Sequence, residues 1–217
     1  MSSRTADLLG GRRLYLCTPD RPDLERFLEN SVSGGVDVVQ LRDKSLQPRD
    51  LVARARLAHR VCSAHGVPFI VNDRPDVALA VGAEGVHVGQ DDVPAAIARR
   101  ILGQNSIVGL STHSESELER SIDEPVDYIS AGPVEETPTK PGRRGTGIGY
   151  VTIANRRSRR PVFITGAVTP EKIPSLWKAG ARHFVVVRFI TQSGDPRSAS
   201  RQLRAVIDEL VETDEID

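Results

Sequence analysis

The sequence predicts a single (β/α)8 barrel of the TIM type, in which eight parallel strands form a closed ring surrounded by helices. The length of 217 residues suits one such domain, which needs roughly 200 residues or more. Short apolar runs alternate with helix-patterned stretches along almost the whole chain, as in repeated strand and helix units. A doubly wound open sheet is less favoured, because Cys17, Thr18, Pro19 and Asp20 stand where that fold has a glycine-rich loop.

Eight apolar runs are the expected strands. Each is short, and a turn or a helix-patterned stretch follows it. They span residues 14–18, 37–41, 68–71, 85–88, 106–110, 128–131, 162–165 and 184–187. Parallel strands that are each followed by a helix close naturally into a barrel.

Five helices are the clearest in the sequence. They span residues 48–64, 94–102, 115–122, 170–178 and 196–212. Several open with a polar residue followed at once, or after one residue, by proline, as at 92–94, 169–170 and 195–196, which is typical of a helix start. Two similar phrases, VGAEGVHV from residue 81 and KAGARHFVVV from residue 178, indicate a glycine that ends a helix and leads into the next strand.

The two ends of the chain are polar, and we expect residues 1–11 to be a frayed tail and residues 213–217 to be an acidic tail. Residues 12–212 would then form the catalytic barrel. The sequence between these limits shows no linker, low-complexity stretch or second domain.

Composition excludes several classes of protein. Basic and acidic residues number 29 each, and this zero net charge argues against a nucleic-acid partner. The apolar run 184–190 contains Arg188 and is far too short to span a membrane. Residues 1–9 lack the apolar core of a secretory signal, so we expect a cytoplasmic protein. Cys17 and Cys62 are expected to be buried, reduced thiols.

Charged and amide side chains follow the second strand, at the face of the barrel where active sites lie. Gln40, Arg42 and Lys44 alternate along the chain, which places them on one side of the extended backbone. A solvated loop would explain a single arginine. The amide of Gln40 lies on the same side of the backbone as two cations, and this combination favours an anion-binding site.

Acidic residues follow the next two strands. Asp73 comes directly after the third strand, and either Asp91 or Asp92 would be its counterpart after the fourth. Plain ion pairs with the neighbouring cations are the simpler interpretation. Two carboxylates beside a basic cluster, however, are what a Mg²⁺ ion with a diphosphate needs. Asp76 is assigned to the first turn of a helix instead.

The fifth strand ends in Ser111, which could contact a substrate. Ser114 and Glu117 have the spacing of a helix capping box and are expected to be structural. His113 stays ambiguous, because a lone histidine at the start of a loop is as often structural as catalytic.

Three later loops point to a second phosphate. The stretch 132–147 is the longest irregular segment, and Thr137, Thr139 and Lys140 suit a lid that closes over phosphate. The loops after the seventh and eighth strands, at 166–168 and 187–188, commonly bind phosphate through backbone N–H groups in such barrels. A diphosphate and a monophosphate in one site indicate a transferase with two substrates.

In chain order, the motifs resemble those of the thiamine phosphate synthase family over nearly the whole chain. The matching pieces are VQLRDK at 39–44, VND at 71–73, GVHVGQDD at 85–92, GLSTH at 109–113, GP at 132–133 and TPTK at 137–140. The resemblance implies a barrel enzyme that joins 4-amino-2-methyl-5-hydroxymethylpyrimidine diphosphate to 4-methyl-5-(2-phosphoethyl)thiazole, giving thiamine phosphate and diphosphate.

The resemblance also implies roles for individual residues. Pyrimidine diphosphate would be bound by Gln40, Leu41, Arg42, Asp43, Lys44, Asn72, Ser111 and Lys140, of which Arg42, Lys44, Ser111 and Lys140 would be catalytic. Thiazole phosphate would be bound by Thr137, Pro138, Thr139, Gly166, Ala167, Val187 and Arg188. One Mg²⁺ per site would be held by Asp73 and Asp92. The implied mechanism is dissociative and needs no protein nucleophile.

Departures from the family pattern leave alternatives open. Ala167 stands where the family usually has a second glycine, Glu135 and Glu136 precede the lid threonines, and Arg188 replaces a common serine. A thiazole tautomerase-like relative that uses His113 is one alternative, and a non-catalytic phosphate-binding relative is another. The expected partners are small-molecule substrates, with no nucleic acid or membrane, and a homo-oligomer is left open.

Overall fold

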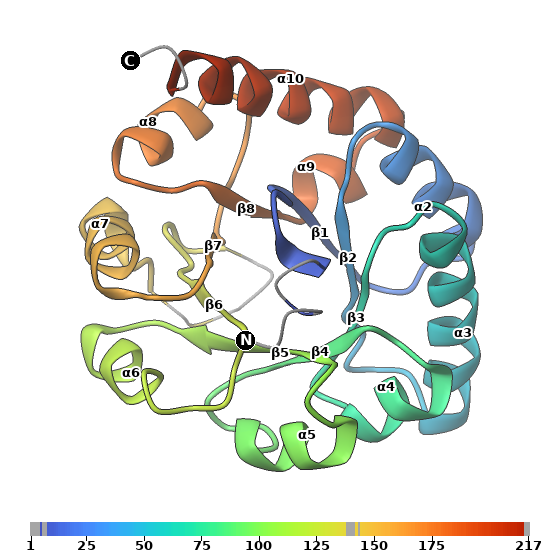
Figure 1. Cartoon of the computed structure of the whole chain (residues 1–217). Helices are drawn as coiled ribbons and strands as arrows, with labels where there is room; N and C mark the ends of the chain where they lie inside the picture. The colour runs from blue at the N-terminus through green and yellow to red at the C-terminus, as the bar shows by residue number, and fades with distance from the viewer. Residues whose placement is uncertain (1–4, 6–7, 138–141, 143, 215–217) are drawn as a thin grey trace.

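Eight parallel strands form a closed barrel in which each strand pairs with its neighbours in chain order, as the sequence predicts (Figure 1). The computed structural model describes Thr5, residues 8–137, Gly142 and residues 144–214. The strands are β1 (Leu14–Thr18), β2 (Val38–Leu41), β3 (Phe69–Asn72), β4 (Gly85–Val88), β5 (Ile107–Thr112), β6 (Tyr128–Ala131), β7 (Val162–Ile164) and β8 (His183–Val186). Pairing of β1 with both β2 and β8 closes the ring.

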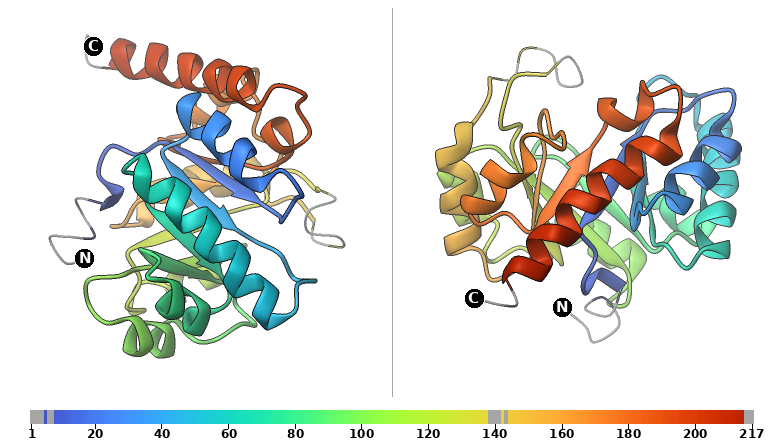
Figure 2. Two further views of the ribbon diagram at one scale, coloured as in Figure 1. Left: turned by 90° about the vertical axis from the view of Figure 1, so that its right-hand side faces the viewer. Right: turned by 90° about the horizontal axis from the view of Figure 1, so that it is seen from above.

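Helices surround the ring of strands (Figure 1). They are α2 (Leu24–Ser33), α3 (Pro48–Ala64), α4 (Pro75–Val81), α5 (Ala95–Leu102), α6 (Glu115–Arg120), α7 (Gly147–Arg157), α8 (Ile173–Lys178), α9 (Arg188–Thr191) and α10 (Pro196–Asp214). Figure 2 shows α10 running along the outside of the barrel. In the part of the chain that the structure describes, no helix is both long and apolar enough to cross a bilayer.

Local sequence signals account for several helix ends. Ser114 caps α6 by accepting a hydrogen bond from the Glu117 backbone, which confirms the capping box. Gly82 ends α4 in the left-handed conformation, and Gly180 has a positive φ just after α8, as the repeated glycine phrases predict. The helix expected at 170–178 begins later, at Ile173.

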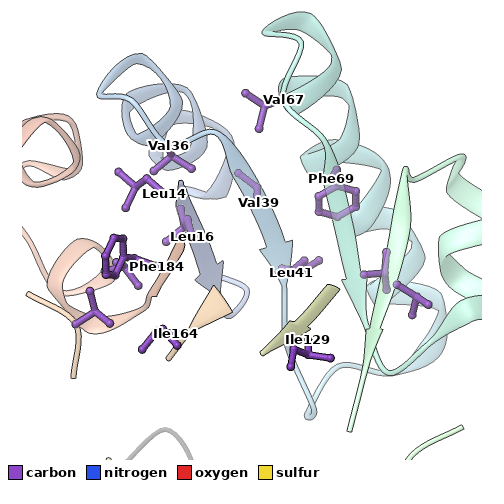
Figure 3. Close-up of a cluster of buried hydrophobic side chains, with 14 of the residues drawn as sticks. Leu14, Leu16, Val36, Val39, Leu41, Val67, Phe69, Ile129, Ile164 and Phe184 are labelled. Carbon is purple, nitrogen blue, oxygen red and sulfur yellow. The ribbon is translucent and has the colours of Figure 1, made fainter. Parts of the chain in front are cut away.

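Side chains alternate between two cores. Leu14 and Leu16 of β1 point outward and pack with neighbouring strands and helices (Figure 3). Tyr15 points into the barrel, where it belongs to a smaller cluster that includes Tyr128 and Phe163. Each large apolar side chain buried in this way contributes about 1.5–3 kcal/mol. The two-residue period therefore separates the scaffold from the barrel interior.

The chain just before β1 closes the amino-terminal end of the interior. The prediction of a frayed tail over residues 1–11 is wrong at Leu9, which is 1% exposed and belongs to the interior cluster. Figure 1 shows this segment crossing the centre of the ring. The open end of the barrel interior needs apolar cover, and Leu9 supplies it. At the other end of the chain, α10 extends to Asp214, two residues beyond the expected helix end.

Candidate active site

A cavity of about 690 Å³ opens at the carboxyl ends of the strands, where the fold predicts an active site. Most of the site residues expected from the sequence line it. They are Gln40, Arg42, Lys44, Asn72, Asp73, Asp92, Ser111, Thr137, Gly166, Ala167, Val187 and Arg188. Pro138, Thr139 and Lys140 lie outside the residues that the structure describes. The structure thus brings together side chains from strands spread over the whole sequence.

Leu41 and Asp43, also expected to bind substrate, do not line the cavity. Leu41 is 1% exposed and packs in the outer core, because it alternates with Gln40 along β2. Asp43 folds its own loop, with Oδ1 accepting hydrogen bonds from the backbone and hydroxyl of Ser45 at 2.8 and 2.6 Å. Asp43 Oδ2 also accepts from the backbone of Asp20 at 3.2 Å, so this carboxylate shapes the loop after β2.

Lys44 and two carboxylates meet at one side of the cavity. Lys44 Nζ lies 2.8 Å from Asp73 Oδ2. Burial raises the pKa of Asp73, and the nearby Asp92 carboxylate raises it further while Lys44 opposes the shift. Asp92 is therefore the acid after β4 that interacts with Asp73, whereas Asp91 is exposed at the rim. Asp76 lies in the first turn of α4, as predicted, and pairs with Arg74.

Backbone contacts fix both acids. Asp73 has a φ of 61°, an unusual left-handed conformation, and its N–H donates to the His87 carbonyl on the neighbouring strand at 2.8 Å. Asp92 Oδ2 accepts from the Gly89 N–H at 2.9 Å. Among the described residues, no group of three or more histidine, cysteine, aspartate or glutamate side chains could hold a metal. The protein offers two carboxylates, an arrangement that suits Mg²⁺ when a substrate supplies further oxygens.

The inner end of the cavity is a network of buried polar side chains that the sequence analysis missed in part. Gln40 Nε2 donates to Tyr15 OH at 2.7 Å, and the Tyr15 and Tyr128 hydroxyls are 3.0 Å apart. His87 joins Tyr128 OH through Nδ1 and Ser111 Oγ through Nε2, both at 2.9 Å. The sequence signal that could have identified Tyr15, Tyr128 and His87 is that each is a polar side chain in an otherwise apolar strand, at a position that the two-residue alternation directs into the barrel.

An ion pair connects the loop after β6 to the loop after β7. Both carboxylate oxygens of Glu135 lie 2.6 Å from Lys172 Nζ, and both side chains line the cavity. The negative charge that Glu135 brings near the expected phosphate lid is therefore balanced. Backbone hydrogen bonding from Val134 to Thr165, at 2.8 Å, holds the same two loops together. Thr137 is buried at the cavity wall.

The loop after β7 has the backbone of a glycine pair although only one glycine is present. Gly166 has a φ of 103°, and a Cβ there would lie 2.4 Å from the Val134 nitrogen, so glycine is required. Ala167 has a φ of 58°, a conformation that costs a non-glycine residue roughly 1–2 kcal/mol. The alanine therefore adopts the left-handed backbone that a second glycine would adopt more easily. Arg188 is exposed and lines the cavity at the start of α9.

His113 also lines the cavity, but its polar atoms have structural contacts. Its Nδ1 contacts the Gly132 carbonyl, and its backbone N–H donates to Glu117 Oε2 at 2.7 Å. A carbonyl oxygen can only accept, so Nδ1 carries a proton in this contact. The ring thus holds the start of the loop after β6.

Comparison with known proteins assigns the family. Residues 14–190 match the family model described as thiamine monophosphate synthase. The thiamine-phosphate synthase of Thermobifida fusca (strain YX) is 45% identical over 202 residues, which cover 90% of this chain and 92% of that protein. That of Mycobacterium sp. (strain KMS) is 42% identical over 204 residues, covering 88% and 90%.

Comparison with solved structures supports the same family assignment. The thiamine phosphate pyrophosphorylase of Pyrococcus furiosus superposes with a TM-score of 0.85 at 27% identity, covering 92% of this chain and 97% of that one. A 3-hexulose-6-phosphate synthase, at a TM-score of 0.67 and 20% identity, shares the barrel fold. With its motifs, its cavity and these relatives in agreement, the chain belongs to the thiamine monophosphate synthase family.

Proposed function

We propose that this chain is a thiamine phosphate synthase, which joins 4-amino-2-methyl-5-hydroxymethylpyrimidine diphosphate to 4-methyl-5-(2-phosphoethyl)thiazole and releases diphosphate. The observation that carries the proposal is the cluster of Lys44, Asp73 and Asp92 at one wall of a cavity large enough for both heterocycles. Membership of the family and the printed function of its relatives support the same reaction.

Asp73 and Asp92 would hold the one Mg²⁺ ion of the site. The Asp92 carboxylate lies close enough to Asp73 to raise the pKa of Asp73, and two neighbouring carboxylates suit a divalent cation. When bound, the ion supplies positive charge to the departing diphosphate. Asp73 and Asp92 would also orient the diphosphate relative to Lys44.

Arg42, Lys44 and Lys140 would neutralise the charge that grows on the diphosphate as its oxygen leaves the pyrimidine methylene carbon. The electron pair of that C–O bond departs with the diphosphate, and the thiazole nitrogen then forms the new C–N bond with its own lone pair. No protein group becomes covalently attached. The contribution of the chain is positioning and preorganised charge, with the loop after β6 excluding water.

The opposite wall would take the thiazole phosphate. Backbone N–H groups at Gly166, Ala167, Val187 and Arg188 would donate to its oxygens, with the hydroxyls of Thr137 and Thr139. The left-handed backbone at Gly166 and Ala167 supports this role, because successive N–H groups in such a turn can face one anion.

A cytoplasmic location belongs to the proposal. Cys17 and Cys62 are both free and buried, a state that a reducing compartment preserves.

The deciding experiment incubates the purified chain with both substrates, with Mg²⁺ and with excess chelator, and measures thiamine phosphate and released diphosphate. We expect equal amounts of the two products with Mg²⁺ and neither with chelator. Tautomerisation of a thiazole without added metal, lost in His113→Gln, would replace the proposal with the tautomerase-like alternative. Binding of both substrates without turnover would indicate the non-catalytic alternative.

A further inference from the structure

Five buried side chains, which we call the floor chain, form one continuous hydrogen-bonded series beneath the cavity. In order they are Gln40 of β2, Tyr15 of β1, Tyr128 of β6, His87 of β4 and Ser111 of β5. None of them is more than 8% exposed. Strands from both sides of the barrel thus contribute to a single polar path that ends at Ser111, in the cavity wall.

The floor chain has a direction, because each hydroxyl carries only one proton. The Gln40 amide is oriented by Cys17, whose Sγ donates to Oε1 at 3.4 Å, so Nε2 faces Tyr15 and donates to its hydroxyl. The other partner of the Tyr15 hydroxyl in the described part of the chain is Tyr128, 3.0 Å away. Tyr15 therefore donates to Tyr128. If Tyr128 donated to Tyr15 instead, the Tyr15 hydroxyl proton would point toward the Gln40 amide, whose N–H group already donates to the Tyr15 oxygen.

Assigning one proton to each hydroxyl in the same way fixes the remaining hydrogen bonds as far as Ser111. Tyr128 accepts from Tyr15, so its own proton goes to His87 Nδ1 at 2.9 Å. This ring nitrogen must then be unprotonated, and the proton of the neutral imidazole lies on Nε2, which donates to Ser111 Oγ at 2.9 Å. Burial raises the pKa values of Tyr15 and Tyr128 above that of a free phenol, so both stay neutral with one proton each.

Ser111 is left as a donor toward the cavity. Its Oγ accepts from His87 and, at 3.4 Å, from the Ser130 hydroxyl, which fills both acceptor positions of the oxygen. Its own proton is available to a ligand in the cavity that it lines. Such a hydroxyl binds an unprotonated acceptor atom and disfavours an N–H group at the same place.

Packing holds the floor chain rigid. The His87 and Tyr128 rings stack with centroids 5.5 Å apart, and Phe163 meets Tyr128 edge-on at 5.0 Å. Gly109 of β5 leaves room for the Tyr128 ring, since a Cβ there would lie 2.1 Å from its Cζ. The phenol therefore cannot move away from His87 without displacing its neighbours.

From these contacts we infer that Tyr15, Tyr128 and His87 are positioning residues that fix the Ser111 hydroxyl as a hydrogen-bond donor to an unprotonated ring nitrogen of the substrate heterocycle. The identity of that heterocycle, a pyrimidine, rests on the proposed function. The direction of the hydrogen bonds along the floor chain does not depend on the proposed function.

The direct test is the tautomer of His87 in the free protein, measured by ¹⁵N NMR of histidine-labelled protein at pH 7.5. The chain has five histidines, and His87→Gln identifies the signal by its loss. We expect a proton on Nε2 and none on Nδ1. In Tyr128→Phe the Nδ1 signal should shift toward that of an unbonded nitrogen. Tyr150→Phe is the matched control, because this buried hydroxyl donates to Thr112 at 2.8 Å, outside the floor chain. A proton on Nδ1 at this pH would overturn the inference.

A second arm measures substrate recognition with pyrimidine diphosphates in which one ring nitrogen is replaced by C–H. One of the two analogues should bind wild type roughly 5- to 10-fold more weakly than the parent compound, as expected for one lost hydrogen bond. In Ser111→Ala this difference should vanish. If the difference persists there, the role of Ser111 is overturned. Thiamine phosphate formation with an Nδ1-protonated His87 would refute the floor chain alone, and absence of pyrimidine binding with the expected tautomer would refute the proposed function.

Discussion

The Lys44 ammonium and the Asp73 carboxylate lie 2.8 Å apart, bridging the ends of two neighbouring strands at the mouth of the barrel. Lys44 follows β2, and Asp73 follows β3 and interacts in turn with Asp92 after β4. Three successive loops thereby present a cation and two acids to one wall of the cavity. Such an arrangement suits a diphosphate with a divalent ion.

Replacing Lys44 tests the cationic part of this wall. We expect Lys44→Ala to lower the rate of diphosphate release about 10- to 100-fold, because one positive charge near the leaving group is lost. Lys178→Ala is the matched control, since Lys178 is exposed on α8 and does not line the cavity. Equal rates for the two variants would show that Lys44 only balances Asp73.

The loop after β7 gives a prediction about backbone strain. Ala167→Gly should raise the free energy of unfolding by up to about 1 kcal/mol, because the left-handed φ of 58° is costly for alanine and glycine offsets part of the gain through its freer unfolded chain. We also expect the KM for thiazole phosphate to fall severalfold. Thermal unfolding and steady-state kinetics measure the two effects. An unchanged KM would mean that the Ala167 methyl group faces away from the phosphate.

A buried ion pair at the opposite end of the barrel gives a prediction about stability alone. Arg99 Nη2 lies 2.5 Å from Asp127 Oδ2, and the same guanidinium donates to the carbonyls of Pro125 and Gly103, both at 3.1 Å. Arg99→Met should lower the free energy of unfolding by about 3–5 kcal/mol, because it leaves a buried carboxylate unpaired. Urea denaturation measures this, and Arg100→Met, on the exposed side of α5, should cost little. Similar losses in both variants would contradict the assignment.

His183 predicts how stability depends on pH. Burial lowers its pKa below the ordinary 6.5, although its Nδ1 donates to the Arg12 carbonyl at 2.6 Å. Below pH 6.5 the unfolded chain takes up a proton that the folded chain resists, so stability is present above this pH and is lost as pH falls. His183→Gln keeps a donor for Arg12 but does not titrate. Melting temperatures between pH 8 and 5 should therefore fall less steeply in the variant, and identical slopes would contradict this account.

The strands and most of the site could be predicted from the sequence for a simple reason. Parallel strands at the centre of a barrel are buried and read as short apolar runs, so their carboxyl ends, and the polar residues there, can be located from the sequence. Arg42, Asp73 and Ser111 were found in this way. Leu41 was assigned as part of a contiguous motif, although its phase along β2 directs it to the outer core.

The hydrogen-bonded series of the floor chain could not be predicted, because three of its members, Tyr15, Tyr128 and His87, lie inside apolar runs and look like core residues. Tyr15 and Tyr128 are 113 positions apart, and only the closure of the barrel brings their hydroxyls together. Leu9 was missed for a related reason. A single apolar residue in a polar segment carries little signal until the open end of the barrel is known to need a cover.

The most direct test of the central claim is the initial rate of thiamine phosphate formation as a function of Mg²⁺ concentration in wild type, Asp73→Asn, Asp92→Asn and Asp76→Asn. We expect the first two variants to lose at least about 100-fold in rate at saturating Mg²⁺, with unchanged melting temperatures, because they remove the acids that we propose hold the ion beside the diphosphate. Asp76→Asn, the control, should match wild type, since this acid pairs with Arg74. Wild-type rates in either Asp73→Asn or Asp92→Asn would contradict the account.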